Sequence, residues 1–309
     1  MQTPTGTLTR EIVSYAGWND CVRLSNGSME LIITTAVGPR ILRCAFVGGS
    51  NLFAEFAADL GRTGDPEWRP YGGHRLWHAP ESVPRTYFPD NGPVEHSWDG
   101  STLTLRQPVE TTTGIAKEMR IALSSSSNRV TVVHRLTNTN LWEIQTAPWC
   151  LSVMAPGGRA ILPQEPFVPF PDQLLPARPL VLWSYTDMSD PRFTWGPRFI
   201  RIRQDADRPA PQKIGLRNTL GWGAYVRGGE LFLKHAPFDR AGTYPDFGCN
   251  WEVYTNADML EMETLGPLTR LPAEGGSVEH TETWLLERLD LGESEGEIEK
   301  QMAAVLAKL

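Results

Sequence analysis

The sequence lacks three features that identify large classes of proteins. No apolar run approaches the ~20 residues of a transmembrane helix, so we expect no membrane partner. Acidic residues outnumber basic ones by 36 to 29, and the net charge of −7 argues against nucleic acid as a partner, because phosphate binding needs a basic surface. The four cysteines form no CxxC pair, so we interpret them as buried thiols rather than as a zinc site or a disulfide set.

The sequence also shows no apolar signal segment at its start, MQTPTGTLTREIV. We therefore expect a cytoplasmic protein, with an exported form whose signal has been removed as the alternative. The 309 residues, of which 40% are hydrophobic, are enough for a large core. Because β folds of this length often form one unit, we expect a single domain over residues 1–309.

Helical periodicity is scarce, and short alternating or β-branched runs take its place. Turn residues separate these runs, and many short strands in this pattern predict an antiparallel sandwich or barrel. The runs lie at residues 28–49, 101–110, 114–138, 149–162, 180–187, 198–205, 220–235 and 277–289.

Two segments depart from the strand pattern. At the C-terminus, Ser294 and Glu297 form a capping box, and apolar residues from Ile298 to Leu309 repeat at helical spacing. The sequence therefore predicts one terminal helix. The stretch 162–179 is rich in proline and in apolar residues, and we expect it to form a loop that packs over the sheet at the rim of a pocket.

The stretch YGGHRLWHAPE, residues 71–81, concentrates polar side chains. His74 and His78 are spaced as on one face of a helix, but the flanking glycines and proline argue against a helix. A zinc motif of the H-E-x-x-H kind would need glutamate where Arg75 stands, so no metal site is predicted. Two interpretations remain: one wall of a polar pocket that includes Glu81, or a packed loop with satisfied histidines.

A second polar stretch, NWEVYTNADMLEMETLGP, covers residues 250–267. On a strand, Glu261 and Glu263 would share one face about 6.5–7 Å apart. Glu263 ends the run before a turn, which suits the mouth of a pocket. Neighbouring carboxylates would raise the pKa of one of them, which suits a group that takes and gives a proton. For Glu261 a solvated strand face is the alternative.

A third stretch, LFLKHAPFDRAGTYPDFGCNWE, covers residues 231–252. Lys234, Tyr244, Asp246 and Asn250 combine an aromatic face with polar groups, and this combination suits a sugar. An ordinary loop whose polar side chains satisfy backbone groups is the alternative. Some of the 11 tryptophans also lie beside polar or glycine-rich segments and are either stacking platforms or core residues. These are Trp68, Trp77 and Trp222.

Four stretches, taken in order, resemble the galactose-mutarotase-like superfamily, whose fold is that of aldose 1-epimerase. They are SMELIITTAVGPRILRCAFVGGSNLF, GGHRLWHAPE, VTVVHRLTNTN and WEVYTNADMLEMETLGPLTRLPAEGGSVEHTETWLL. The resemblance is strongest to a bacterial branch of the superfamily. It implies an all-β protein, a β-supersandwich of large antiparallel sheets with a sugar-binding cleft, followed here by the predicted C-terminal helix.

The resemblance also implies roles for individual residues. Glu263 matches the glutamate that acts as base on the anomeric hydroxyl, and Glu261 matches a ligand-binding glutamine. His74 and Arg75 match a binding motif only loosely. The histidine that protonates the ring oxygen in this family has no counterpart in TAPWCLSVMAPGG, residues 146–158, so His74 is expected to supply that proton, with His78 and His235 as other sources.

The favoured interpretation is thus a cofactor-free aldose 1-epimerase-like enzyme acting on a small carbohydrate. The alternatives are a sugar-binding or sensing protein without catalysis, and another carbohydrate-active enzyme such as a glycoside hydrolase, which needs opposed carboxylates. The oligomeric state stays open. The predicted catalytic residues are Glu263 and His74, and the predicted substrate-binding residues are Arg75, His78, Glu81, Lys234, Tyr244, Asp246, Asn250 and Glu261.

Overall fold

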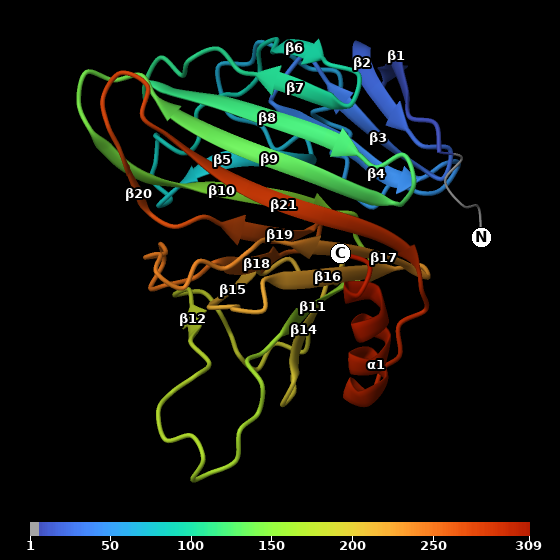
Figure 1. Ribbon diagram of the computed structural model, residues 1–309, viewed down its shortest axis with the longest axis vertical. Helices are drawn as coiled ribbons and strands as arrows, with labels where there is room; N and C mark the ends of the chain where they lie inside the picture. Colours follow the sequence, from blue (N-terminus) through green and yellow to red (C-terminus); the bar gives the residue numbers. More distant parts are fainter. Residues whose placement is uncertain (1–5) are drawn as a thin grey trace.

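The computed structural model describes residues 6–309 and is built mainly of strands (Figure 1). An eleven-stranded sheet contains the N-terminal strands and, beside them, strands from the middle and the end of the chain. In spatial order its strands are β1 (Thr9–Tyr15), β2 (Trp18–Ser25), β3 (Met29–Thr34), β4 (Arg40–Phe46), β5 (Gly73–Ala79), β10 (Ile144–Met154), β19 (Leu260–Leu265), β18 (Trp251–Thr255), β15 (Gln212–Leu216) and β12 (Leu180–Leu182), with β20 (Thr269–Leu271) paired to β10.

A ten-stranded sheet faces this larger sheet. Its strands in spatial order are β13 (Phe193–Trp195), β14 (Phe199–Arg203), β11 (Arg159–Pro163), β16 (Trp222–Arg227), β17 (Glu230–His235), β21 (Ser277–Arg288), β9 (Arg129–Asn138), β8 (Ile115–Leu123), β7 (Thr102–Arg106) and β6 (Glu95–Trp98). All pairings within the two sheets are antiparallel. The predicted all-β fold is confirmed.

The main core lies between the two sheets. Strands β8 and β9 show the simplest pattern, because buried and half-buried residues alternate along both of them. In the centre of the larger sheet, Leu76, Cys150 and Met262 belong to this core. The residues on either side of them therefore point to the opposite face, away from the smaller sheet. All four cysteines are buried and free, as predicted.

The predicted C-terminal helix is α1 (Glu295–Leu306), and its capping box is present. Ile298, Met302 and Val305 pack against the outer face of the smaller sheet, where Trp222 belongs to the same apolar cluster. Figure 1 places α1 beside β16 and β17. Within residues 6–309, no helix is both long and apolar enough to cross a bilayer.

Glycines set the entry into β5. Gly72 and Gly73 have φ angles of +93° and +71°, which an L side chain adopts with strain. A Cβ atom on Gly72 would lie 2.0 Å from the carbonyl oxygen of Ala54, and one on Gly73 would lie 2.2 Å from that of Ile41. The two glycines therefore allow β5 to enter closely beside its neighbours.

The stretch 162–179 does not pack over the sheet, and that expectation is wrong. Figure 1 shows the loop between β11 and β12 extending away from both sheets at the bottom of the view. Every residue from 166 to 177 is exposed. Apolar composition suggested a packed loop, but the chain leaves β11 and returns through β12 without meeting a surface that would cover these side chains.

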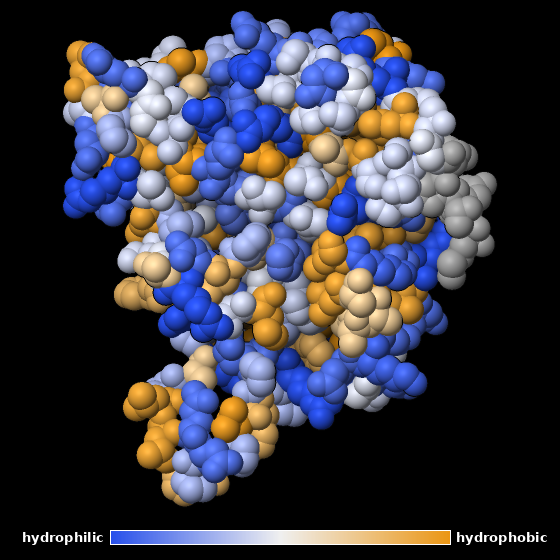
Figure 2. Space-filling view, in the orientation of Figure 1, coloured by the Kyte–Doolittle hydropathy of each residue, from blue (hydrophilic) through white to orange (hydrophobic). Residues whose placement is uncertain are grey.

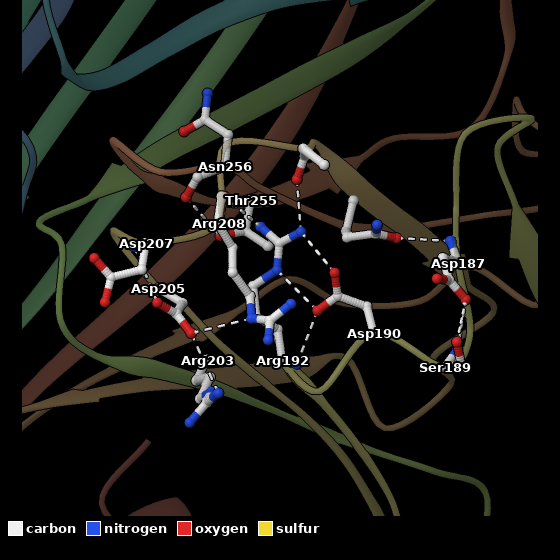
Figure 3. A network of polar contacts seen from close by, with 12 residues as sticks. Asp187, Ser189, Asp190, Arg192, Arg203, Asp205, Asp207, Arg208, Thr255 and Asn256 are labelled. Carbon is white, nitrogen blue, oxygen red and sulfur yellow. Dashed lines mark hydrogen bonds and ion pairs between the residues drawn. The ribbon is translucent and has the colours of Figure 1, made fainter.

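The chain that follows β12 is held by a polar network (Figure 3). Asp190 accepts two hydrogen bonds from Arg192, at 3.0 Å from Nε and 2.9 Å from Nη2. The guanidinium of Arg192 is fully buried and also donates to the carbonyl oxygens of Arg208 and Ala210. The backbone N–H of Asp187 donates to Gln212 on β15 at 2.8 Å. The network thereby fixes the segment after β12 against the edge of the larger sheet.

Candidate functional site

A cavity of about 290 Å³ lies on the face of the larger sheet that points away from the smaller sheet. The register of β5, β10 and β19 places Arg75, Leu151 and Glu263 side by side in one row across its floor. Lys213 of β15 and Tyr254 of β18 also line the cavity. The remaining walls are largely aromatic, and these rings belong to Trp68, Trp77, Tyr87, Trp149 and Tyr185.

One ammonium group joins two carboxylates at this cavity. Lys213 Nζ lies 3.0 Å from Glu263 Oε2 and 2.8 Å from Glu252 Oε2. Glu263 Oε2 also accepts a hydrogen bond of 2.8 Å from Trp149 Nε1. The side chains of both glutamates are fully buried. Lys213 and Trp149 therefore hold the Glu263 carboxylate in one orientation.

Arg75 forms a second ion pair in the same cavity. Its Nη2 donates to Glu261 Oε1 at 2.9 Å. Its guanidinium lies 4.4 Å from the ring centroid of Trp77 and 5.4 Å from that of Trp68, within the range of cation–π attraction. Stacking on the rings fixes the plane of the guanidinium, so that its remaining N–H groups have fixed directions.

Several buried polar atoms of this cavity have no hydrogen-bond partner within residues 6–309. They include one acceptor, Glu263 Oε1, and four donors, namely Arg75 Nε and Nη1 and the indole nitrogens of Trp68 and Trp77. A buried polar group without a partner is costly. An acceptor and several donors around one cavity can be satisfied by a ligand that carries several hydroxyl groups.

The cavity perturbs its own titrating groups. Burial raises the pKa of Glu261, and the charge of Glu263 adds to this rise while Arg75 opposes it. Burial also raises the pKa of Glu252 well above its ordinary value. Burial disfavours the charged form of Lys213, but Glu263 and Glu252 outweigh it and hold the pKa of Lys213 well above its usual range. The site thus combines a charged lysine with two carboxyl groups that hold their protons to a higher pH than an ordinary glutamate does.

The structure brings four of the predicted site residues together: Arg75, Glu81, Glu261 and Glu263 all line the cavity. Glu81 accepts a hydrogen bond from the phenol of Tyr87, another lining residue. The two glutamates of β19 share one face, as the strand pattern predicted. The binding and catalytic roles of these residues stay predictions.

The structure does not bring His74 to Glu263, and the prediction that they share one site is wrong. His74 follows Gly73 on β5 and points between the two sheets, where it is fully buried. Lys234 also points between the sheets and donates to the carbonyl oxygens of Cys150 and Met262. Because strand neighbours alternate between faces, the residue that lines the cavity is Arg75.

His78 also lies on the inner side of the larger sheet and not in the cavity. Its Nε2 is 3.3 Å from Glu110 Oε2, and Glu110 forms an ion pair with the buried Lys117. Arg85 Nη1 contacts the other ring nitrogen of His78 at 3.2 Å. His78 is therefore one member of a buried group of charges, and the structure does not place it with the predicted site residues that line the cavity.

The loop before β18 does not reach the cavity either. The side-chain amide of Asn250 accepts from the backbone N–H of Asn218 at 2.7 Å and donates to its carbonyl oxygen at 2.9 Å, and thereby ties two loops together. Tyr244 stacks on Phe238, with ring centroids 5.1 Å apart, and its hydroxyl accepts from the N–H of Asp239. Asp246 lies in the same loop at a φ of +49°. None of the three predicted residues Tyr244, Asp246 and Asn250 is among the residues lining the cavity.

His74 belongs instead to a chain of hydrogen bonds between the sheets. His134 Nδ1 donates to the carbonyl oxygen of His280 at 3.1 Å, so in neutral His134 the Nε2 is an acceptor. His74 Nε2 lies 2.7 Å from it and must donate. His74 Nδ1 then accepts from Ser152 at 2.9 Å, and Ser152 Oγ accepts from Lys234 Nζ at 3.1 Å.

Glu282 completes this interior network. It pairs with Lys234 Nζ at 2.9 Å and accepts from Trp284 Nε1 at 2.8 Å and from Thr264. Burial opposes its ionisation, but the charge of Lys234 outweighs burial and lowers the pKa of Glu282 well below its ordinary value. Burial lowers the pKa of His74 well below its ordinary range and that of His134 to about 4. The network is therefore one ion pair surrounded by neutral imidazoles.

The ligand atoms of His74, His134 and Glu282 lie within 4.8 Å of one another, which prompts the question of a metal. The 2.7 Å between the two imidazole nitrogens is a hydrogen-bond distance, shorter than the ~3.3 Å that two nitrogens in a tetrahedral zinc site would have. Glu282 is already paired with an ammonium group. The geometry fits a hydrogen-bonded network.

Sequence reasoning missed Lys213 and Trp149 as residues that line the cavity, and Glu252 as the second carboxylate that pairs with Lys213. Lys213 lies within PQKIGL, a short run that the strand pattern passed over, although a lysine inside an apolar strand signals a buried partner. Trp149 stands two residues before Leu151 on β10 and so shares its face. These residues come from three strands that only the sheet order brings together.

A comparison with models of known protein families and with curated protein sequences finds no match. Solved structures do match. One is a TPR-domain containing protein from Parabacteroides distasonis (12% identity, TM-score 0.58), where the match covers 88% of this chain and 48% of that one, so this chain spans about half of its length. Another is the Slr1438 protein from Synechocystis sp. PCC 6803 (10% identity, TM-score 0.59), covering 89% and 99% of the two chains.

A third structure carries the name that the sequence suggested. It is a galactose mutarotase-like protein from Lactobacillus casei, with 11% identity and a TM-score of 0.55, and the match covers 86% of this chain and all of that one. The order and pairing of the two large antiparallel sheets agree with the predicted β-supersandwich. At this identity the likeness extends to the fold, and the chain has the galactose mutarotase-like fold.

Proposed function

We propose that the cavity over β5, β10 and β19 binds a carbohydrate and catalyses the interconversion of its anomers, the reaction of an aldose 1-epimerase. The observation that carries the proposal is Glu263 Oε1. This carboxylate oxygen is buried, has no partner within residues 6–309 and belongs to a residue that lines the cavity. It is suited to accept the anomeric O–H of a sugar.

The aromatic walls support a carbohydrate. Sugar rings offer C–H patches that pack against tryptophan and tyrosine, while their hydroxyl groups need several donors and acceptors in fixed positions. Arg75 Nε and Nη1 and the indole N–H groups of Trp68 and Trp77 supply such donors.

The proposed reaction needs a base and an acid. Glu263 takes the proton of the anomeric hydroxyl, while a second group protonates the ring oxygen, and the ring opens to the aldehyde. Rotation about the bond between C1 and C2, followed by return of both protons, closes the ring as the other anomer. Proton transfer by positioned groups contributes about 10²–10⁴-fold to such reactions.

We assign the acid role to Glu261, because His74 lies on the other face of the sheet. Burial raises the pKa of Glu261, so this carboxyl can carry a proton closer to neutral pH. Two residues apart on one strand, Glu261 and Glu263 lie about 6.5–7 Å apart along the cavity floor. That separation leaves room for the two oxygens of a sugar's anomeric centre between them.

A second function, sugar binding without catalysis, is favoured by one observation. Leu151 occupies the floor of the cavity on the central strand β10, directly beside Glu263. An apolar side chain there can support a sugar ring but cannot transfer a proton. If Glu261 stays paired with Arg75 throughout, the cavity retains binding alone.

The test is magnetisation-exchange NMR between α and β anomeric signals of a panel of aldoses. We expect the wild type to accelerate exchange and Glu263→Gln to lose most of it, by about 100-fold or more. Glu299→Gln, on the exposed helix α1, is the matched control and should match the wild type. Equal acceleration by Glu263→Gln would contradict the proposal, and line broadening of a sugar without accelerated exchange would establish the binding function instead.

A further inference from the structure

The loop of residues 164–179, here called the arm, exposes several large apolar side chains. Phe167, Phe170, Leu174 and Leu175 are 71%, 86%, 73% and 78% exposed. Figure 2 shows apolar side chains gathered along the arm at the bottom of the view. Single exposed apolar residues are ordinary, but a contiguous group on a projecting segment indicates an interaction site.

Hydrogen bonds within the arm and at its base hold it in one conformation. At its tip the N–H of Asp172 donates to the carbonyl oxygen of Pro169 at 2.9 Å. At its base Arg178 Nε donates to the carbonyl oxygen of Glu165 at 2.9 Å and so ties the two limbs together. The Glu165 side chain accepts from the N–H of Thr219 at 3.0 Å. These contacts give the arm a defined shape.

We propose that the arm pairs with the arm of a second copy of this chain in a two-fold symmetric dimer. An open hollow of about 350 Å³ lies along the arm, and its lining includes the apolar side chains of Phe167, Val168 and Leu175. Phe170 projects from the same segment and is 86% exposed. A projection and a hollow on one segment are self-complementary, as a two-fold interface requires.

The arm offers enough apolar area for an interface at the small end of the specific range. Each of the four large side chains has a surface on the order of 150–200 Å² and is 71–86% exposed. Covering all four removes about 500 Å² of apolar surface per copy from solvent. Two copies together bury about 1,000 Å² from these side chains alone, which reaches the lower limit of specific interfaces. Backbone and proline atoms of the arm add to this value.

The charges of the arm fit the same arrangement. Asp172 stands at the tip and forms no ion pair within residues 6–309. Arg178 stands at the base and lines the hollow, and its Nη2 is buried without a hydrogen-bond partner in the described chain. When two arms lie antiparallel, the tip of each meets the base of the other. Asp172 then faces Arg178 of the partner subunit.

The oligomeric state of the full chain tests the proposal by sedimentation velocity over a range of concentrations. We expect a dimer for the wild type and a rise in its dissociation constant of about 30-fold or more for Phe170→Ser combined with Leu174→Ser. Phe247→Ser, at a phenylalanine that is 95% exposed outside the arm, is the matched control and should remain dimeric. Because all these side chains are exposed in the single chain, thermal unfolding measured at concentrations where the wild type is monomeric should not change.

A wild type that stays monomeric would overturn the proposal, including the case in which the arm binds lipid vesicles instead. A dimer that survives the double substitution would overturn it as well. A cross-link provides a second measurement, since the four native cysteines are buried. Leu175→Cys, midway between Asp172 and Arg178 and so at the two-fold axis, should form a disulfide-linked dimer under oxidation, whereas Ser126→Cys, in the exposed turn between β8 and β9, should not. Absence of the Leu175→Cys cross-link in a dimer would contradict the arm-to-arm arrangement.

Discussion

Acidification from neutral pH to about pH 5 should destabilise the protein through the histidines between its two sheets. Burial lowers the pKa of His134 and of His280 to about 4, against an ordinary value of 6.5. At pH 5 both are neutral in the folded protein and protonated in the unfolded chain. The unfolded state then binds more protons, so their contribution to stability is complete above pH 6.5 and is lost as the pH falls toward 4.

The magnitude follows from the distance between pH 5 and the ordinary pKa of histidine. That distance is about 1.5 pH units at about 1.4 kcal/mol each, so each histidine accounts for a loss of about 2 kcal/mol. Glu252 and Glu261 act in the opposite direction, because their raised pKa lets the folded state take up protons. Comparison of the wild type with a variant isolates the histidine contribution.

The assay is urea unfolding followed by tryptophan fluorescence at neutral pH and at pH 5. His280→Gln keeps an N–H group near Thr264, which lies 2.9 Å from His280 Nε2, but removes the titration. We expect this variant to lose about 2 kcal/mol less than the wild type on acidification. The exposed His96 provides the control His96→Gln, which should behave as the wild type. The same loss in His280→Gln and in the wild type would refute the reasoning.

Three further predictions concern other parts of the molecule. Lys117→Met leaves the buried Glu110 without its ammonium partner and should lower the free energy of unfolding by about 3–5 kcal/mol. Adding Glu110→Gln to the same chain should restore part of this lost free energy, as measured by urea unfolding. Gly73→Ala places a Cβ against the Ile41 carbonyl at a φ of +71° and should lower the free energy of unfolding by at least about 2 kcal/mol in the same assay. The control Gly100→Ala, whose Cβ meets open space, should lower it by less. Arg75→Lys cannot reproduce the planar stacking on Trp77 and should weaken sugar binding about tenfold or more in fluorescence titration; unchanged affinity would remove Arg75 from the proposed site.

The fold class could be predicted because its signals are local. Alternation in residues 114–138 indicated β8 and β9, and the capping box at Ser294 located the helix. Glu261 and Glu263 could be assigned to one face for the same reason, since a strand has a period of two. Each of these inferences needs only a short stretch of chain.

The assembly of the site could be predicted only in part, because it depends on which face of each strand meets which partner. The stretch 71–81 was recognised as polar but not as a strand, so His74 and Arg75 were given one surface although they point to opposite faces. Lys213 reaches Glu263 because β15 lies two strands from β19 in the sheet. The order in which distant segments pair within a sheet cannot be read from any single stretch of the sequence. The arm shows the same limit, since its apolar composition does not indicate that residues 166–177 project from the fold.

The central claim is that a sugar occupies the outer cavity beside Glu263 and not the interior near His74. The most direct measurement is a crystal structure of the protein soaked with an aldose that gives NMR evidence of binding. The account predicts a sugar ring over Leu151 with a hydroxyl oxygen at hydrogen-bond distance from Glu263 Oε1. A sugar bound elsewhere on the molecule, with the outer cavity holding only water at saturating sugar, would contradict it.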